Sequence, residues 1–160
     1  MITLAYAAGL FDGEGCVQFT RCRSWIHPRI LVVNTHRGVL EDLQHQFGGD
    51  INSLRHRRPR WKSSWMWRLN GGAAVRFLDR INPWLVIKAR HAHTVFAWNA
   101  IRVGSGHRVT DDHREAFALL QERMKWLNRK GPNNDPDPVD AIAMRKAGKP
   151  KPRKASRRKG

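Results

Sequence analysis

Acidic residues are scarce in this sequence: 13 Asp and Glu stand against 30 Lys and Arg, so the formal net charge at pH 7 is +17. A charge excess of this size points to a polyanionic partner, most commonly a nucleic acid. Nine of the basic residues lie in 145–160, a stretch without any acid, yet the first 144 residues still carry +8 without them. The positive charge therefore belongs to the body of the chain as well as to its C-terminal tail.

Cysteines and long apolar runs are also few. Cys16 and Cys22 fall in one predicted strand, where they are not placed to bridge each other, and they lack the spacing of zinc ligands. No apolar run approaches the ~20 residues of a membrane span, and residues 1–8 lack the basic start of a signal peptide. We therefore expect a soluble, intracellular protein with no membrane partner.

The length of the chain, 160 residues, suits about one domain. We expect this domain over residues 1–130, with its core over 2–102 and an extra helix over about 110–130. Residues 131–160 are basic and contain several prolines, so we expect them to be disordered unless they are bound to a partner.

One apolar segment, residues 3–17 (TLAYAAGLFDGEGCV), is rich in Ala and Gly and ends in two carboxylates. A carboxylate at the end of a buried segment needs compensating partners, and a metal ion is one of them. Helical spacing places small residues on one stripe, which would let a second copy of the helix approach closely; the stripe consists of Ala5, Ala8, Gly9 and Asp12. Gly13 and Gly15 should make a sharp turn that places Glu14 at the bottom of the helix pair. The simpler interpretation is a buried helix followed by a solvated turn.

The patterns along the rest of the chain predict an α+β fold. Alternation of apolar and polar residues predicts strands over 16–23, 29–34 and 63–69, with a turn over 25–28, and a strand with weaker alternation over 51–57. Apolar residues at helical spacing predict helices over 37–47, stopped by Gly48–Gly49, and over 73–81. An extended segment over 83–88 leads to a helix over 89–102, and Thr110 should cap the last helix. The side chains expected to face the core from the strands are Val17, Phe19, Ile30, Val32, Trp65, Trp67 and Leu69.

The nine residues 7–15, AAGLFDGEG, resemble the motif that names the LAGLIDADG homing endonucleases. Further matches follow at 32–35, 47–49, 65–67, 77–78 and 83–88, so that the resemblance covers about residues 2–100. It implies an αββαββα fold in which a four-stranded antiparallel saddle sheet, backed by helices, lies in the DNA major groove. Because the sequence holds one copy of the motif, the resemblance implies a homodimer on a near-palindromic double-stranded target.

The resemblance also implies the active-site residues. Glu14, with the backbone carbonyl of Gly13, would hold a divalent metal, expected to be Mg²⁺, which prefers oxygen ligands. Asp12 is expected to order the helix ends across the dimer interface, the alternative being a metal ligand. Lys88 matches the active-site lysine of the family, although a lysine at a helix start is disfavoured by the helix dipole.

Two further candidate residues, Asn34 and Arg37, each have a functional and a purely structural interpretation. Asn34 stands where relatives often carry a glutamine that orders water, or it is an ordinary cap for the following helix. Arg37 contacts the scissile phosphate, or it is a surface residue of that helix. We interpret His91 and His93 as polar surface residues or phosphate neighbours.

The expected DNA contacts come from the outward strand positions and from a basic loop, since a β-ribbon fits the major groove. Candidates for base contacts are Gln18, Thr20, Cys22, Ser24, Arg29, Leu31, Met66 and Arg68. Candidates for phosphate contacts are Arg55, Arg57, Arg58, Arg60 and Lys62.

The resemblance implies an intron-encoded, site-specific homing endonuclease that makes a metal-dependent, staggered double-strand cut. The alternatives are an RNA maturase that assists splicing of its own intron and a catalytically inactive DNA-binding regulator on the same scaffold. None of the three predicts a small-molecule substrate.

Overall fold

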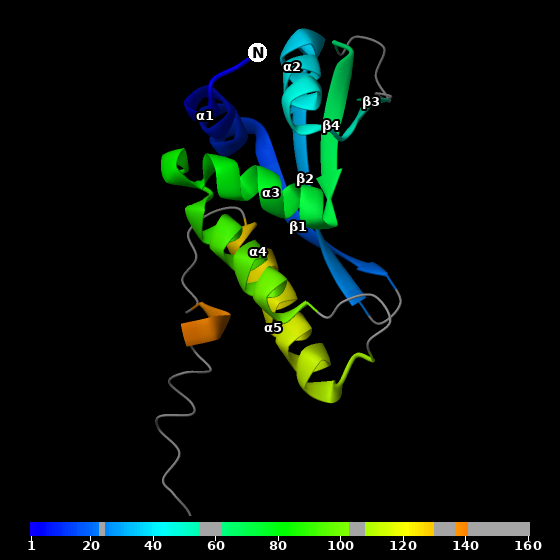
Figure 1. The fold of residues 1–160 in the computed structure, drawn as a ribbon, viewed down its shortest axis with the longest axis vertical. Coiled ribbons are helices and arrows are strands. Elements are labelled where there is room, and N and C mark those ends of the chain that lie inside the picture. The colour runs from blue at the N-terminus through cyan, green and yellow to red at the C-terminus, as the bar shows by residue number, and fades with distance from the viewer. Residues whose placement is uncertain (23–24, 55–61, 103–107, 130–136, 141–160) are drawn as a thin grey trace, which may run out of the picture.

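The computed structural model describes residues 1–22, 25–54, 62–102, 108–129 and 137–140 (Figure 1). The order of elements is the predicted αββαββα, followed by two more helices. In chain order the elements are α1 (Leu4–Glu14), β1 (Gly15–Cys22), β2 (Trp25–Asn34), α2 (Arg37–Phe47), β3 (Asp50–Leu54), β4 (Ser64–Asn70), α3 (Gly71–Ile81), a 3₁₀ helix (Asn82–Trp84), α4 (Ala89–Ile101) and α5 (Asp111–Leu127).

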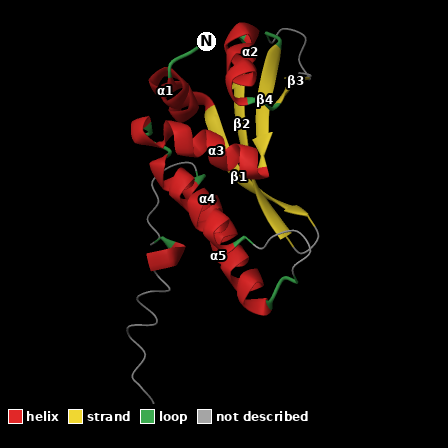
Figure 2. Cartoon of the chain, viewed as in Figure 1, coloured by secondary structure: helices red, strands yellow, loops and turns green. Residues whose placement is uncertain are grey.

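The four strands form one antiparallel sheet in the order β1-β2-β4-β3. One face of the sheet is apolar and buried, with Val17, Ile30, Val32 and Trp67 fully covered. These side chains pack with residues of α1, α2, α3 and α4 in the main core, and α3 crosses β2 and β4 (Figure 2). The core-facing set predicted from alternation is confirmed, and the opposite face of the sheet carries polar side chains beside apolar ones such as Leu31 and Met66.

The β1–β2 hairpin is longer than predicted, because residues 25–28 belong to β2 and do not form a turn. The two strands pair from Gly15↔Val32 to Cys22↔Trp25. Pro28 is accommodated because β4 joins β2 only from Arg29, so at Pro28 the sheet has a neighbour on one side alone and no ladder hydrogen bond is lost on the other.

A second hydrophobic cluster supports the far half of this hairpin. Ile26, Trp98, Val109, Phe117 and Leu120 are buried together, and they bring α4 and α5 against the hairpin. The indole N–H of Trp98 donates to the carbonyl oxygen of Ile26 at 2.9 Å. The two C-terminal helices therefore extend the fold beyond the αββαββα unit.

Local signals fix most of the helix ends. Gly48 and Gly49 both have positive φ, 76° and 92°, which favours glycine and ends α2. The indole N–H of Trp67 donates to the carbonyl oxygen of Gly48 at 2.8 Å and ties this end to the core. The Thr110 side chain accepts the N–H of His113, and the capping box is completed by the His113 side chain, so the predicted cap of α5 is confirmed.

The segment 83–88 is not extended as predicted. It starts in the 3₁₀ helix, where the N–H of Leu85 donates to the carbonyl oxygen of Asn82, and it continues through bends to α4. Leu85 is buried and anchors the segment, whereas Val86 and Ile87 are exposed. The apolar run predicted an extended segment, but only one of its three aliphatic residues, Leu85, is buried.

Asp137 is a buried contact that sequence patterns did not indicate. Its carboxylate accepts hydrogen bonds from Arg90 of α4 at 2.7 Å and from Arg123 of α5 at 3.1 Å. The rest of the segment predicted to be disordered, 131–136 and 141–160, lies outside the described residues.

Candidate active site

The motif segment passes directly from helix to strand. Thr3 caps α1 by accepting the N–H of Tyr6, and α1 ends at Glu14 where β1 begins. A Cβ atom at Gly15 would collide with the carbonyl oxygen and the ring of Phe11, so glycine is required at this junction. Gly13, by contrast, lies within α1 and does not form the turn. Glu14 is exposed and is the last residue of α1.

Asp12 is engaged within its own chain. Its carboxylate accepts the backbone N–H groups of Val86, Ile87 and Lys88 at 2.8, 3.2 and 2.8 Å. These donors precede α4, and an anion at a helix N-terminus is also favoured by the helix dipole. With 9% of its surface exposed, Asp12 joins the end of α1 to the start of α4.

Lys88 lies at the N-cap position of α4, beside the motif. Its ammonium group donates to the backbone carbonyl oxygen of Asp12 at 2.5 Å. The carbonyl and the carboxylate of Asp12 together offset the unfavourable position of a cation at a helix start. Lys88 also acts on Cys16 at the start of β1: burial raises the pKa of the Cys16 thiol, and the lysine charge opposes that rise.

The small-residue stripe predicted to face a second chain is corrected at two positions. Ala8 is fully buried in the main core and Asp12 is covered by residues 86–88, so neither side chain is offered to another molecule. The exposed residues at four-residue spacing are Ala5, Gly9 and Gly13. A Cβ atom at Gly9 or Gly13 would meet no other atom within 4 Å, so this face of α1 is open.

Glu14 and Asn34 line the same small hollow, with a volume of about 280 Å³. Val33, Thr35 and Ser64 complete its lining. The side-chain oxygen of Asn34 accepts the N–H of His36 at 2.8 Å, which leaves its amide nitrogen as the group that could order water. The cap of α2 is His36 and not Asn34, since the ring nitrogen of His36 accepts the N–H of Val39. Arg37 is exposed and pairs with Glu41 at 2.9 Å.

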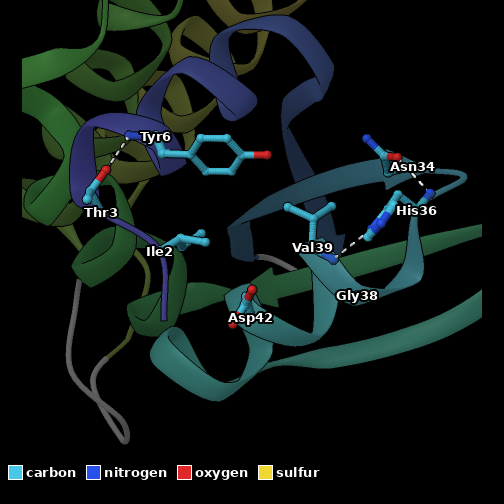
Figure 3. A pocket seen from close by; sticks show the side chains of 8 residues that line it. All are labelled: Ile2, Thr3, Tyr6, Asn34, His36, Gly38, Val39 and Asp42. Carbon is cyan, nitrogen blue, oxygen red and sulfur yellow. Dashed lines mark hydrogen bonds between the residues drawn. The ribbon is translucent and has the colours of Figure 1, made fainter.

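A larger pocket, about 770 Å³, lies between the first turn of α1 and the start of α2 (Figure 3). It is lined by Ile2, Thr3, Tyr6, Asn34, His36, Gly38, Val39 and Asp42. Neither Glu14 nor Lys88 lines this pocket, whereas Glu14 lines the smaller hollow.

The predicted outward positions of the sheet lie in cross-strand rows. Gln18 is opposite Arg29, whose guanidinium donates to Asn70, and Leu31 is opposite Arg68. Arg68 pairs with Asp50 at 3.4 Å, and Met66 is opposite Val33 and Asn52. Thr20, Cys22 and the exposed Lys62 are also described. The remaining candidates, Ser24, Arg55, Arg57, Arg58 and Arg60, lie outside the described residues.

Sequence reasoning missed several residues of this face. His27 is opposite Thr20 and exposed, but it fell in the segment predicted as a turn. Asp50 and Asn52 of β3 were missed because alternation in that strand is weak, and only their pairing with β4 assigns them to the outer face.

The prediction that His91 is a surface residue is wrong. It is buried between α4 and α5, where it forms hydrogen bonds with the Leu127 backbone and the Asn128 side chain, and its buried Nδ1 has no partner among the described residues. Burial, followed by the charge of Lys88, lowers the pKa of His91 below its usual value of about 6.5. His93 is exposed.

Within the described ranges, no group of three or more His, Cys, Asp or Glu side chains is placed to hold a metal ion. Among the helices of those ranges, none combines the length and apolarity needed to cross a membrane.

Comparison with known proteins finds no matching family profile and no matching curated protein, but it finds solved structures with the same fold. The homing endonuclease I-CvuI, in complex with its target in the presence of calcium, is 20% identical, with a TM-score of 0.60 over 90% of this chain and 92% of that one. The archaeal intron-encoded homing endonuclease I-Vdi141I, complexed with DNA, is 16% identical, with a TM-score of 0.62 over 91% and 97%. The LAGLIDADG homing endonuclease I-SmaMI, bound to cleaved DNA, is 13% identical, with a TM-score of 0.55 over 90% of this chain and 49% of that one. The fold of the chain is therefore that of the LAGLIDADG homing endonucleases, as the resemblance of residues 7–15 implies.

Proposed function

We propose that this protein is a site-specific DNA endonuclease of the homing type, which works as a homodimer and makes a metal-dependent, staggered double-strand cut. The observation that carries the proposal is the arrangement at the end of α1. There an exposed carboxylate, Glu14, lies two positions after Asp12, whose carbonyl oxygen accepts a hydrogen bond from the ammonium of Lys88. A carboxylate and a cation at one helix end suit phosphodiester hydrolysis, because the carboxylate can bind a metal ion and the cation can offset negative charge on the phosphate.

The donor groups at this end fit a divalent cation such as Mg²⁺. The Glu14 carboxylate is exposed and carries hard oxygen atoms, and the carbonyl of Gly13 is the second oxygen donor of the proposed set. A bound divalent metal would offset the negative charge of the phosphate and activate the attacking water. Because each chain offers one such carboxylate, two copies of Glu14 would face the scissile region of a duplex.

The remaining site residues have roles that follow from their contacts. Lys88 would polarise the water network or the phosphate, since its ammonium is held beside the motif. The amide nitrogen of Asn34 would order water in the hollow that it shares with Glu14. Arg37 would contact a phosphate. Its ion pair with Glu41 is exposed to solvent and contributes little free energy, so the guanidinium can leave Glu41 for the phosphate.

The homodimer is supported by the open face of α1 and by the comparisons. Ala5, Gly9 and Gly13 give a second copy of the helix room to approach. The alignment covers 49% of I-SmaMI, so about half of that longer protein has no counterpart in one copy of this chain. A second copy would supply that counterpart.

Double-stranded DNA is supported as the partner by the polar face of the sheet and by the charge of +17. Gln18, Arg29 and Arg68 lie on that face with groups suited to base edges. I-Vdi141I and I-SmaMI, which share this fold, were each solved in complex with DNA. Affinity should fall steeply with salt, since phosphate contacts release counterions.

The test is cleavage of a plasmid that carries the uninterrupted copy of the locus from which the gene derives. The full chain with Mg²⁺ should linearise the plasmid, chelation of the metal should prevent it, and sequencing of the ends should show a stagger. Glu14→Gln should bind the plasmid but not cut it, whereas Glu115→Gln, an exposed change on α5, should cut normally. Failure of the wild-type chain to cut, together with binding of the intron RNA, would favour the maturase.

A further inference from the structure

The end of α5 contacts both parts of the candidate site through one side chain. Asn128, which follows α5, donates from its amide nitrogen to the backbone carbonyl oxygen of Val17 at 2.7 Å. Its side-chain oxygen accepts a hydrogen bond from the ring of His91. Val17 lies in β1, three positions after Glu14. His91 lies in α4, three positions after Lys88. One amide group therefore joins the strand that follows the carboxylate to the helix that follows the cation.

His91 is a costly residue at its position unless its N–H has a role. Only 8% of its surface is exposed, and its Nδ1 has no partner among the described residues. The hydrogen bonds to the Leu127 backbone and the Asn128 side chain therefore come from Nε2. A buried polar group costs free energy where it lacks a partner, and an apolar side chain would pack here without that cost. The groups that His91 joins explain a polar residue at this position better than packing does.

A second set of contacts holds the same turn of α4. The guanidinium of Arg90 donates to the buried carboxylate of Asp137 at 2.7 Å and lies 5.0 Å from the ring centroid of Trp126 in α5. Arg123 of α5 donates to the same carboxylate at 3.1 Å. The first turn of α4, which begins next to Lys88, is thus held at two consecutive residues, 90 and 91.

We propose that Asn128 is a positioning residue for hydrolysis, which fixes Glu14 and Lys88 relative to each other by bonding to both β1 and α4. The inference rests on the proposed function, because it requires those two residues to act together. The end of α1 already reaches the start of α4 through Asp12. Asn128 makes the second connection, through β1 and α5, so the site is held from two sides. Reacting groups need support of this kind, since small displacements cost much of the rate.

The first test is single-turnover cleavage of the target plasmid at saturating chain concentration, with the affinity for DNA measured separately. Asn128→Leu and His91→Phe each remove the hydrogen bond between α5 and α4. Each should lower the cleavage rate about tenfold, with the DNA dissociation constant unchanged. The double variant should be no slower than the slower single variant, because both changes break one connection. His91→Gln keeps an N–H donor in place of Nε2 and should restore most of the rate.

The matched control is Thr94→Val, which removes a buried hydroxyl of α4 that donates within its own helix, to the carbonyl oxygen of Arg90 at 2.8 Å. It should lower the melting temperature and leave the rate unchanged, which separates a loss of stability from a displaced site. Wild-type rates in Asn128→Leu and His91→Phe, or a loss confined to DNA affinity, would overturn the inference and leave the proposed function intact. A wild-type chain that does not cut would overturn both.

Hydrogen exchange in the chain without DNA or metal gives a readout that does not depend on cleavage. The backbone N–H of Lys88 donates to the Asp12 carboxylate at 2.8 Å, so its exchange rate reports whether the start of α4 stays at the motif. This rate should rise several-fold in Asn128→Leu and stay unchanged in Thr94→Val. Equal protection of the Lys88 amide in Asn128→Leu and in the wild-type chain would also overturn the inference.

Discussion

Asp12 and Glu14 are two carboxylates at one helix end, and their variants should fail in opposite ways. Asp12→Ala removes the acceptor of three backbone N–H groups, those of Val86, Ile87 and Lys88. A hydrogen bond to a charged group contributes roughly 1.5–3 kcal/mol. Water can replace part of this at the exposed Val86 and Ile87, so we expect a total loss of about 2–4 kcal/mol of the free energy of unfolding.

This loss should be visible in the melting temperature and in the cleavage rate. About 2–4 °C of melting temperature corresponds to 1 kcal/mol for a chain of this size, which predicts a fall of roughly 4–16 °C. Release of residues 86–88 also frees Lys88 from its position, and a misplacement of this kind can cost about 10²-fold in rate. Asp12→Asn keeps one acceptor oxygen and should show a smaller effect on both quantities.

The assays are thermal unfolding followed by circular dichroism and single-turnover cleavage of the target plasmid. The matched variant is Glu14→Gln, which is exposed and should change stability by no more than about 0.5 kcal/mol, while it abolishes cleavage. If Asp12→Ala melted and cut like the wild-type chain, the inferred link between α1 and the start of α4 would be refuted.

Three further changes test other parts of the structure. Gly9→Leu should leave the monomer folded, because Gly9 is exposed and a Cβ atom there has nothing within 4 Å, but sedimentation should show loss of the dimer. Gly15→Ala should instead lower the melting temperature through its collision with Phe11. His91 has a lowered pKa in the folded chain, so its contribution to stability is present above about pH 6.5 and is lost as the pH falls; urea unfolding at several pH values should show this slope flattened in His91→Gln. Asp137→Asn should cost roughly 2–3 kcal/mol, less than the 3–5 kcal/mol of a fully buried pair, because Arg90 is half exposed; an unchanged urea midpoint would contradict this.

Much of the fold could be predicted from local patterns. The period of the apolar residues and the Gly48–Gly49 stop give α2 its observed bounds, Arg37–Phe47. The alternation of Trp65 and Trp67 assigns the core face of β4. Each helix or strand has its own spacing of apolar residues, and residues such as glycine mark where it ends. The order of elements can therefore be predicted from the sequence alone.

What could not be predicted depends on contacts between distant segments. The sequence motif predicts a dimer-interface role for Asp12, whereas the structure shows that its carboxylate binds backbone N–H groups of residues 86–88. These donors lie more than 70 positions away in the sequence, so the motif alone does not reveal them. Ala8 belongs to a small-residue stripe, yet periodicity does not say whether a stripe is covered by the same chain or by another. His91 was interpreted as a surface residue because only the packing of α5 buries it.

The two hydrophobic clusters have a consequence for how such a chain could change over time. The main core holds α1 and its carboxylates, while the far half of the β1–β2 hairpin rests on a separate cluster with α4 and α5; Phe19 and Val75 pack against both. Substitutions on the outward face of the hairpin should therefore combine additively with changes around α1, except where they disturb those two shared side chains. If the proposed function holds, new DNA sequence preferences could accumulate on the hairpin while the residues around Glu14 stay unchanged, so that a change in the DNA target need not abolish cleavage.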